Sequence, residues 1–108
     1  MDSLSIIVYF LCMFIESLHS RKAEIERVAG AFGARRIRVF GSVSRGEETP
    51  DSDIDFLVDF PAGYDMFVQR LPLMEKLAEL TGRRVDIIPE HELSHLIRER
   101  VLHEARDL

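Results

Sequence analysis

Three aspartates lie in or beside two short apolar stretches of a type common in β-strands. Asp53 and Asp55 flank Ile54, and alternation along a strand would place both carboxylates on one face with Cα atoms about 6.5 Å apart. Asp86 stands in the middle of the second stretch, where a charge is otherwise unfavourable. Neighbouring carboxylates repel one another and are stabilised by a bound cation. Hard oxygen ligands suit Mg²⁺, and two such ions can hold the attacking and leaving oxygens of a phosphoryl or nucleotidyl transfer.

Asp86 has two interpretations. On its own it is compatible with a solvent-facing position in a strand. If its strand lies next to the strand of Asp53 and Asp55, it completes a carboxylate triad, in which it could bind the metal and accept a proton from an attacking hydroxyl. The presence of the other two aspartates favours the functional interpretation.

A Gly-Ser pair ends the preceding apolar stretch. Gly41 allows a sharp turn and a close approach of the backbone to a ligand, and Ser42 opens a short helical turn whose free N–H groups favour an anion. Arg45 is a candidate contact for a phosphate, or an ion-pair partner for the acidic residues that follow. A Gly-Ser pair is a weak signal alone, and its position between a strand and the spaced aspartates makes it a candidate phosphate site.

The elements that would position these residues follow from periodicity. Apolar residues with helical spacing predict a helix from Ser20 to Phe32, a mostly helical stretch over 64–80 with Pro72 in a first turn or at a break, and a closing helix capped by Ser94. Met66 and Met74 are expected in the core. Strands are predicted at 37–40, 53–60 and 84–88. This order predicts one α/β (α+β) domain, a small mixed β-sheet flanked by helices.

Length and composition restrict the function further. The chain has 108 residues, enough for one core, and its charge of 14 − 19 = −5 argues against a protein that coats nucleic acid phosphates. The single cysteine, Cys12, cannot form an internal disulfide. We therefore expect a cytoplasmic protein without direct nucleic acid binding.

The amino-terminal residues 1–19 form a separate apolar segment before a domain that we expect over 20–108. The run from Leu4 to Ile15 is too short to span a bilayer as a helix, and it lacks the basic start of a signal peptide. A buried or partner-facing segment is favoured over a membrane or export role. A start codon downstream of this run is a further possibility.

The spacing Gly41-Ser42, ten residues, then Asp53-Ile54-Asp55 resembles the signature of the DNA polymerase beta-like nucleotidyltransferase superfamily. The longer string GSVSRGEETPDSDIDFLVDF is similar to that of the minimal nucleotidyltransferases, the MNT proteins of prokaryotic HEPN/MNT toxin–antitoxin pairs. The resemblance covers residues 20–108, including the stretch around Asp86, and the run from Leu4 to Ile15 does not match it.

This resemblance implies a nucleotidyltransferase fold with ATP and two Mg²⁺ at the Gly41-Ser42 turn. Asp53 and Asp55 match the metal ligands, and Asp86 matches the third carboxylate, which activates the acceptor hydroxyl. The resemblance also implies pairing with a HEPN toxin and, as in characterised members, transfer of AMP from ATP to a tyrosine of that toxin. The unmatched amino-terminal run leaves both homo- and hetero-oligomers open.

Two other classes of function stay open. A binding antitoxin would neutralise its toxin by occlusion, with the nucleotide site unused. A small-molecule nucleotidyltransferase, such as an antibiotic adenylyltransferase, would need a second domain for its acceptor, and 108 residues leave no room for one. The same argument disfavours template-directed polymerases.

Overall fold

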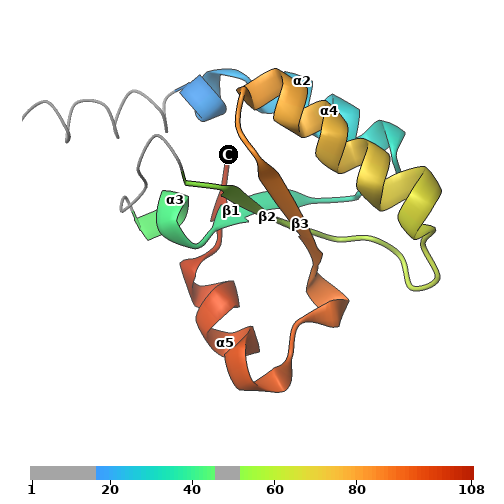
Figure 1. The fold of residues 1–108 in the computed structure, drawn as a ribbon. Helices are drawn as coiled ribbons and strands as arrows, with labels where there is room; N and C mark the ends of the chain where they lie inside the picture. Colours follow the sequence, from blue (N-terminus) through green and yellow to red (C-terminus); the bar gives the residue numbers. More distant parts are fainter. Residues whose placement is uncertain (1–16, 46–51) are drawn as a thin grey trace, which may run out of the picture.

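The computed structural model describes residues 17–45 and 52–108. Its centre is a four-stranded mixed sheet with the strand order β3-β2-β1-β4 (Figure 1). The strands are β1 (Ile37–Phe40), β2 (Ile54–Val58), β3 (Val85–Pro89) and β4 (Arg106–Asp107). β2 is parallel to β3 and antiparallel to β1, and β1 is antiparallel to β4. β3 therefore forms an edge of the sheet.

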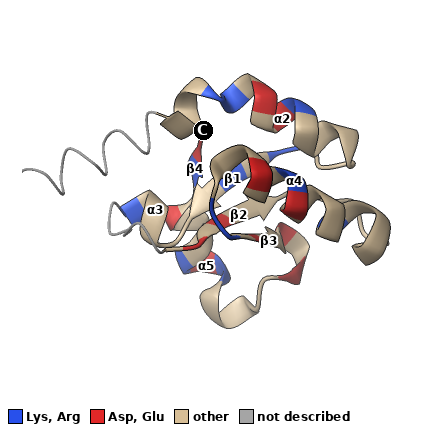
Figure 2. Cartoon of the chain, turned by 45° about the horizontal axis from the view of Figure 1, so that its top comes forward, with Lys and Arg blue, Asp and Glu red and all other residues tan. Residues whose placement is uncertain are grey.

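Two helices cover one face of the sheet. These are α2 (Lys22–Ala31) and α4 (Leu71–Thr81), which lie side by side above the strands in Figure 1. Their apolar stripes meet the inward residues of the strands in a single core, whose fully buried members include Ile25, Leu73, Leu77, Ile54, Phe56 and Ile87. Acidic and basic residues are interspersed along both helices (Figure 2).

The opposite face carries α5 (His95–Glu104), which lies below the sheet in Figure 1. Ser94 caps this helix by accepting a hydrogen bond from the backbone N–H of Leu96 at 3.3 Å. The short helix α3 (Ser42–Arg45) follows β1, and the 3₁₀ turn η2 (Glu90–Glu92) joins β3 to α5.

A π-helical turn, η1 (Met66–Arg70), leads directly into α4. The Asp65 carboxylate accepts hydrogen bonds from the backbone N–H groups of Phe67 and Val68, so this side chain starts the turn. Pro72 occupies the first turn of α4, one of the two places that the sequence allowed for it.

The predicted α/β fold with a small mixed sheet is confirmed, and two details differ. β4 was not predicted. Met66, expected in the core, is 39% exposed because the turn started by Asp65 directs it outward, whereas Met74 packs against the core. The apolar run from Leu4 to Ile15 lies outside the described residues. Within 17–45 and 52–108, no helix is both long and apolar enough to cross a membrane.

Candidate active site

Asp55 and Asp86 lie directly opposite each other on neighbouring strands. They are register partners in the parallel pair of β2 and β3, so the structure confirms that the two strands are adjacent. Phe40, the last residue of β1, is the partner of Asp55 on its other side. The row Phe40–Asp55–Asp86 therefore crosses the sheet at the end of β1 and the beginning of β2.

Both carboxylates face away from the main core. Ile54 and Phe56 flank Asp55 in β2 and are fully buried under α2 and α4, so alternation directs Asp55 to the other face of the sheet. Val85 and Ile87 flank Asp86 in the same way. Asp55 is half-buried and Asp86 is exposed at the sheet edge.

The environment of Asp55 disfavours its charged form. Burial raises the pKa of this carboxyl, the negative charges of Asp86 and then Asp53 raise it further, and the positive charge of Arg45 lowers it. A half-buried carboxyl with like charges beside it gains from a neighbouring cation, because the cation removes both the repulsion and part of the cost of burial.

Gly41 makes room for Asp55. Its backbone has φ +72°, which favours glycine, and a Cβ at this position would lie 2.5 Å from the Asp55 Oδ2 atom. The predicted turn after β1 is therefore present, and its glycine has a definite role: it lets the backbone touch the carboxylate.

The α3 helix that follows is tied to the end of α5. The buried Ser44 hydroxyl donates to the backbone carbonyl of Glu104, and the Arg45 guanidinium forms an ion pair with the Glu104 carboxylate at 3.1 Å. The ion-pair partner of Arg45 is therefore Glu104, which the sequence did not predict. Ser42, the predicted phosphate contact, lies at the first position of α3 and is partly exposed.

Asp53 departs from the expected triad. It lies one residue before β2 and forms an ion pair with Arg84, with 3.1 Å between its Oδ1 atom and the arginine Nε. Among the described residues, no three His, Cys, Asp or Glu side chains converge closely enough to hold a metal ion. Arg84 was not singled out, although it directly precedes β3 and lies two residues before Asp86.

An open hollow of about 360 Å³ adjoins these residues at the edge of the sheet. One side of the hollow is formed at the beginnings of β2 and β3, by Asp53, Arg84 and Asp86. The other side is formed by α4, with Met74, Glu75 and Ala78. A ligand could therefore reach Asp86 from solvent without any movement of the core.

The donor set fits Mg²⁺. Carboxylate oxygens are the ligands this ion prefers, it needs only one or two of them, and Asp55 and Asp86 stand side by side on neighbouring strands. Asp53 could join them once its ion pair with Arg84 opens, which costs little because both side chains are substantially exposed, 49% and 83%.

A sequence profile of the family described as "Nucleotidyltransferase domain" matches residues 24–108. A protein of Methanocaldococcus jannaschii named as a protein adenylyltransferase is 32% identical over 92 residues, which cover 85% of this chain and 98% of that protein. The protein adenylyltransferase MntA of Thermococcus cleftensis is 44% identical over 74 residues, 68% of this chain and 74% of that protein.

Solved structures agree with these relatives. One of a minimal nucleotidyltransferase has a TM-score of 0.76 and 43% identity, and the match covers 86% of this chain and 94% of that one. A toxin–antitoxin crystallised with AMP-PNP has a TM-score of 0.68 and 25% identity, over 80% of this chain and 70% of that one. The predicted resemblance is therefore confirmed: the chain belongs to the nucleotidyltransferase domain family, among the minimal nucleotidyltransferases.

Proposed function

We propose that this chain is a Mg²⁺-dependent protein adenylyltransferase and acts as an antitoxin. It transfers AMP from ATP to a hydroxyl, that of a tyrosine, on a partner HEPN toxin in the cytoplasm, and residues 20–108 are the unit that carries the activity. The observation that carries the proposal is the side-by-side placement of Asp55 and Asp86 beside the Gly41-Ser42 turn.

Each residue has a role in this proposal. The Gly41-Ser42 turn and Arg45 bind the phosphates of ATP, and Asp53, Asp55 and Asp86 hold two Mg²⁺. When bound, the ions neutralise the charge that builds up on the phosphate oxygens during transfer. The half-buried Asp55 is suited to a permanent ligand, whereas the exposed Asp86 is accessible to a second macromolecule.

Asp86 also receives the proton of the acceptor hydroxyl. As this proton moves to the Asp86 carboxylate, the hydroxyl oxygen forms a bond to the α-phosphorus of ATP. The bond from the α-phosphorus to the bridging oxygen of the β-phosphate breaks, and pyrophosphate leaves with that electron pair. The products are an AMP ester of the acceptor and pyrophosphate, so atoms and charge balance.

The comparisons support both the transfer of an adenylyl group to a protein and the role as an antitoxin. Relatives named protein adenylyltransferases favour a protein as the acceptor. A structural neighbour crystallised as a toxin–antitoxin with AMP-PNP favours a toxin as the partner and an adenine nucleotide as the substrate.

Intact-mass spectrometry tests the proposal. The protein encoded by the gene next to this chain's gene is incubated with the chain, ATP and Mg²⁺, and we expect its mass to rise by one or more AMP units. With Asp86→Asn the rate should fall by about a hundredfold or more, because the proton acceptor is lost. No added mass with the unaltered chain, or an undiminished rate with Asp86→Asn, would contradict the proposal.

One observation favours the alternative of a non-catalytic binding antitoxin. Asp53 is paired with Arg84, and among the described residues no three acidic side chains converge as a ligand set. Protection of cells from the toxin discriminates the two functions. If the chain is a binding antitoxin, its Asp53→Asn variant should protect cells as well as the original chain does. If the chain is catalytic, the variant should lose protection.

A further inference from the structure

Glu104 is the last residue of α5, and the chain is held in place on both sides of it. One turn earlier in the helix, the side chain of Val101 is buried. Two residues after Glu104, Arg106 begins β4 and pairs with Val39 of β1. The backbone of Glu104 is therefore fixed relative to the sheet, and its side chain extends from a fixed point.

Glu104 contacts α3 through both its backbone and its side chain. Its backbone carbonyl accepts a hydrogen bond from the buried Ser44 hydroxyl. The two oxygens of its carboxylate lie 3.2 and 3.1 Å from the Nη1 atom of Arg45. The Glu104 side chain is only 18% exposed, so this ion pair is better shielded from water than a pair on the open surface. One glutamate thus holds α3 and also sets the direction of the Arg45 side chain.

Arg45 is also close to Asp55. Its backbone N–H donates to the carbonyl of Gly41 at 3.1 Å, so the two residues are one helical turn apart. Residues at this spacing have Cβ atoms about 5–6 Å from each other. A Cβ at Gly41 would lie 2.5 Å from the Oδ2 atom of Asp55. The positive charge of Arg45 lowers the pKa of the Asp55 carboxyl, in agreement with this proximity. The Asp55 carboxylate is therefore within reach of the Arg45 side chain.

Two carboxylates can therefore compete for the Arg45 guanidinium. If the guanidinium bound Asp55, it would neutralise that carboxylate and occupy oxygens that a metal ion needs. When the guanidinium binds Glu104, as it does in the structure, it neutralises a carboxylate on a different element. The charge on Glu104 thus affects how available Asp55 is to a cation.

We infer that Glu104 is a positioning residue for the proposed metal site: its carboxylate holds the Arg45 guanidinium and so leaves Asp55 to the metal. This inference rests on the proposed function, which requires Mg²⁺ at the aspartates. It adds a residue from the end of α5, which acts on the metal through Arg45.

The test is a cycle of four proteins: the original chain, Glu104→Gln, Arg45→Gln and the double variant. Glutamine has nearly the shape of glutamate without its charge, and the backbone carbonyl of this residue still accepts from Ser44. Circular dichroism with a thermal melt establishes that each variant folds. Paramagnetic resonance of free Mn²⁺ then gives the Kd for Mn²⁺ without nucleotide, at an ionic strength of about 0.15 M, which screens the direct effect of a lost charge.

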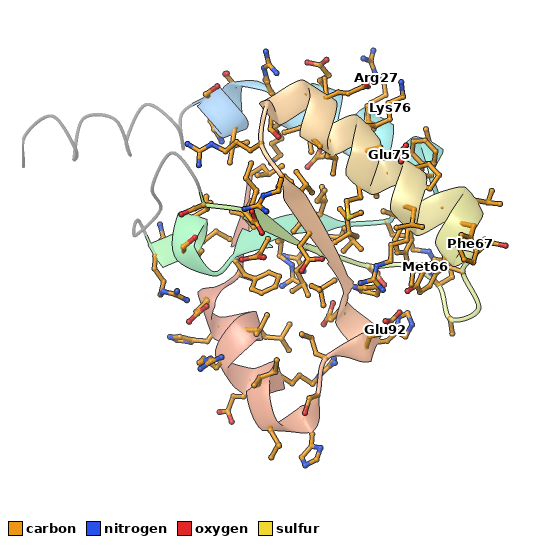
Figure 3. All side chains as sticks on the ribbon, in the orientation of Figure 1. Arg27, Met66, Phe67, Glu75, Lys76 and Glu92 are labelled. Atoms are coloured by element: carbon orange, nitrogen blue, oxygen red, sulfur yellow. The ribbon has the colours of Figure 1, made fainter. Side chains whose placement is uncertain are left out.

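Glu92→Gln is the matched control. Glu92 of η2 also pairs with an arginine, since its Oε1 atom lies 3.2 Å from Nη1 of Arg70. Figure 3 shows Glu92 beyond the end of β3 that is remote from α3. Asp86, in contrast, is the second residue of β3. This variant therefore removes the same charge and a comparable ion pair at a place away from the candidate site.

We expect Glu104→Gln to raise the Kd for Mn²⁺ about tenfold, because the released guanidinium binds Asp55. In the Arg45→Gln background the same change should alter the Kd by less than about threefold, since no guanidinium is left to move. Glu92→Gln should also stay within about threefold of the original chain. A merely structural role of Glu104 would lower the melting midpoint without this dependence on Arg45.

An unchanged Kd in folded Glu104→Gln would overturn the inference. An equal rise in both backgrounds would overturn it too, because Glu104 would then act through its charge alone. The AMP-transfer assay separates this result from the proposed function. If the Mn²⁺ cycle behaves as expected but no AMP is transferred, the proposed function fails and the role of Glu104 stands. If AMP is transferred and the cycle shows no coupling, only the role of Glu104 fails. An original chain that binds no Mn²⁺ would contradict both.

Discussion

At the residue scale, the carboxylate of Asp55 is arranged for a ligand rather than for stability. It is half-buried, it faces Asp86 across the strand pair, and the Gly41 backbone packs against it. Without a cation, charging this group in the folded protein costs free energy, because burial and like charges raise its pKa above the usual value.

The first prediction is that Asp55→Asn stabilises the protein in EDTA. A raised pKa means that the ionised carboxyl destabilises the folded state at neutral pH, so its removal should raise the midpoint of thermal unfolding at pH 7. The gain should vanish as the pH falls below the ordinary value of 3.8, where the carboxyl is protonated in both states. Asp59→Asn, at the other end of β2, makes the same charge change and controls for net charge. An Asp55→Asn midpoint at or below that of the original chain would contradict this explanation.

The second prediction concerns Arg84. The guanidinium of Arg84 forms an ion pair with the Asp53 carboxylate. The variant Arg84→Gln should therefore free that carboxylate and tighten Mn²⁺ binding in the absence of nucleotide. The gain should be small, about two- to fivefold, since exposed ion pairs are worth less than about 1 kcal/mol. Paramagnetic resonance of free Mn²⁺ gives the affinity, and Arg35→Gln controls for the lost charge. Weaker or unchanged binding would show that Arg84 does not compete with the metal.

The sequence predicts part of the site because part of it is local. The side on which Asp55 and Asp86 lie follows from alternation within each strand, and the row of Asp55 and Asp86 needs only that the strands be neighbours. The ion pair of Asp53 with Arg84 depends on the register between strands separated by 26 residues of chain, which no local pattern specifies.

At the element scale, the turn between β1 and α3 positions the site, and its glycine is the critical residue. We predict that Gly41→Ala lowers stability by about 1–3 kcal/mol through backbone strain at φ +72°. It should also lower the transfer rate about a hundredfold, because the new Cβ displaces the Asp55 carboxylate by about an ångström.

Gly63→Ala is the matched control. Gly63 lies in the turn beyond β2 and also has a positive φ, +85°. A Cβ added at Gly63 would meet open space. Chemical denaturation and transfer rates should show a similar loss of stability for both variants and a loss of transfer for Gly41→Ala alone. Equal effects on transfer would mean that the contact with Asp55 is unimportant.

Helices and strands with a strong periodicity of apolar residues were predictable from the sequence. Elements that depend on tertiary contacts were not. The paired residues of β4 are Arg106 and Asp107, which carry no strand pattern and are ordered by pairing with β1 and by the ion pair of Asp107 with Arg36 at 3.2 Å. The outward direction of Met66 follows from the Asp65 cap and the π-helical turn, whose geometry shifts the apolar pattern away from helical spacing.

At the scale of the whole molecule, the two faces of the sheet have separate tasks. The face under α2 and α4 holds the core and fixes the register of β2 and β3. The other face presents the carboxylates, with α5 attached beside them by polar contacts. A packed face and an accessible face on one sheet would let a small domain present its carboxylates to a second protein.

The most direct test of the account uses ATP labelled at two positions. The proposed toxin partner is incubated with the chain, Mg²⁺ and ATP carrying ³²P at either the α- or the γ-phosphate, and label on the partner is measured after denaturing electrophoresis. Adenylyl transfer predicts label from α-labelled ATP only, and none when Asp86→Asn replaces the original chain. Label from γ-labelled ATP would indicate phosphoryl transfer, and no label from either, with the toxin still bound and inactive, would leave a binding antitoxin.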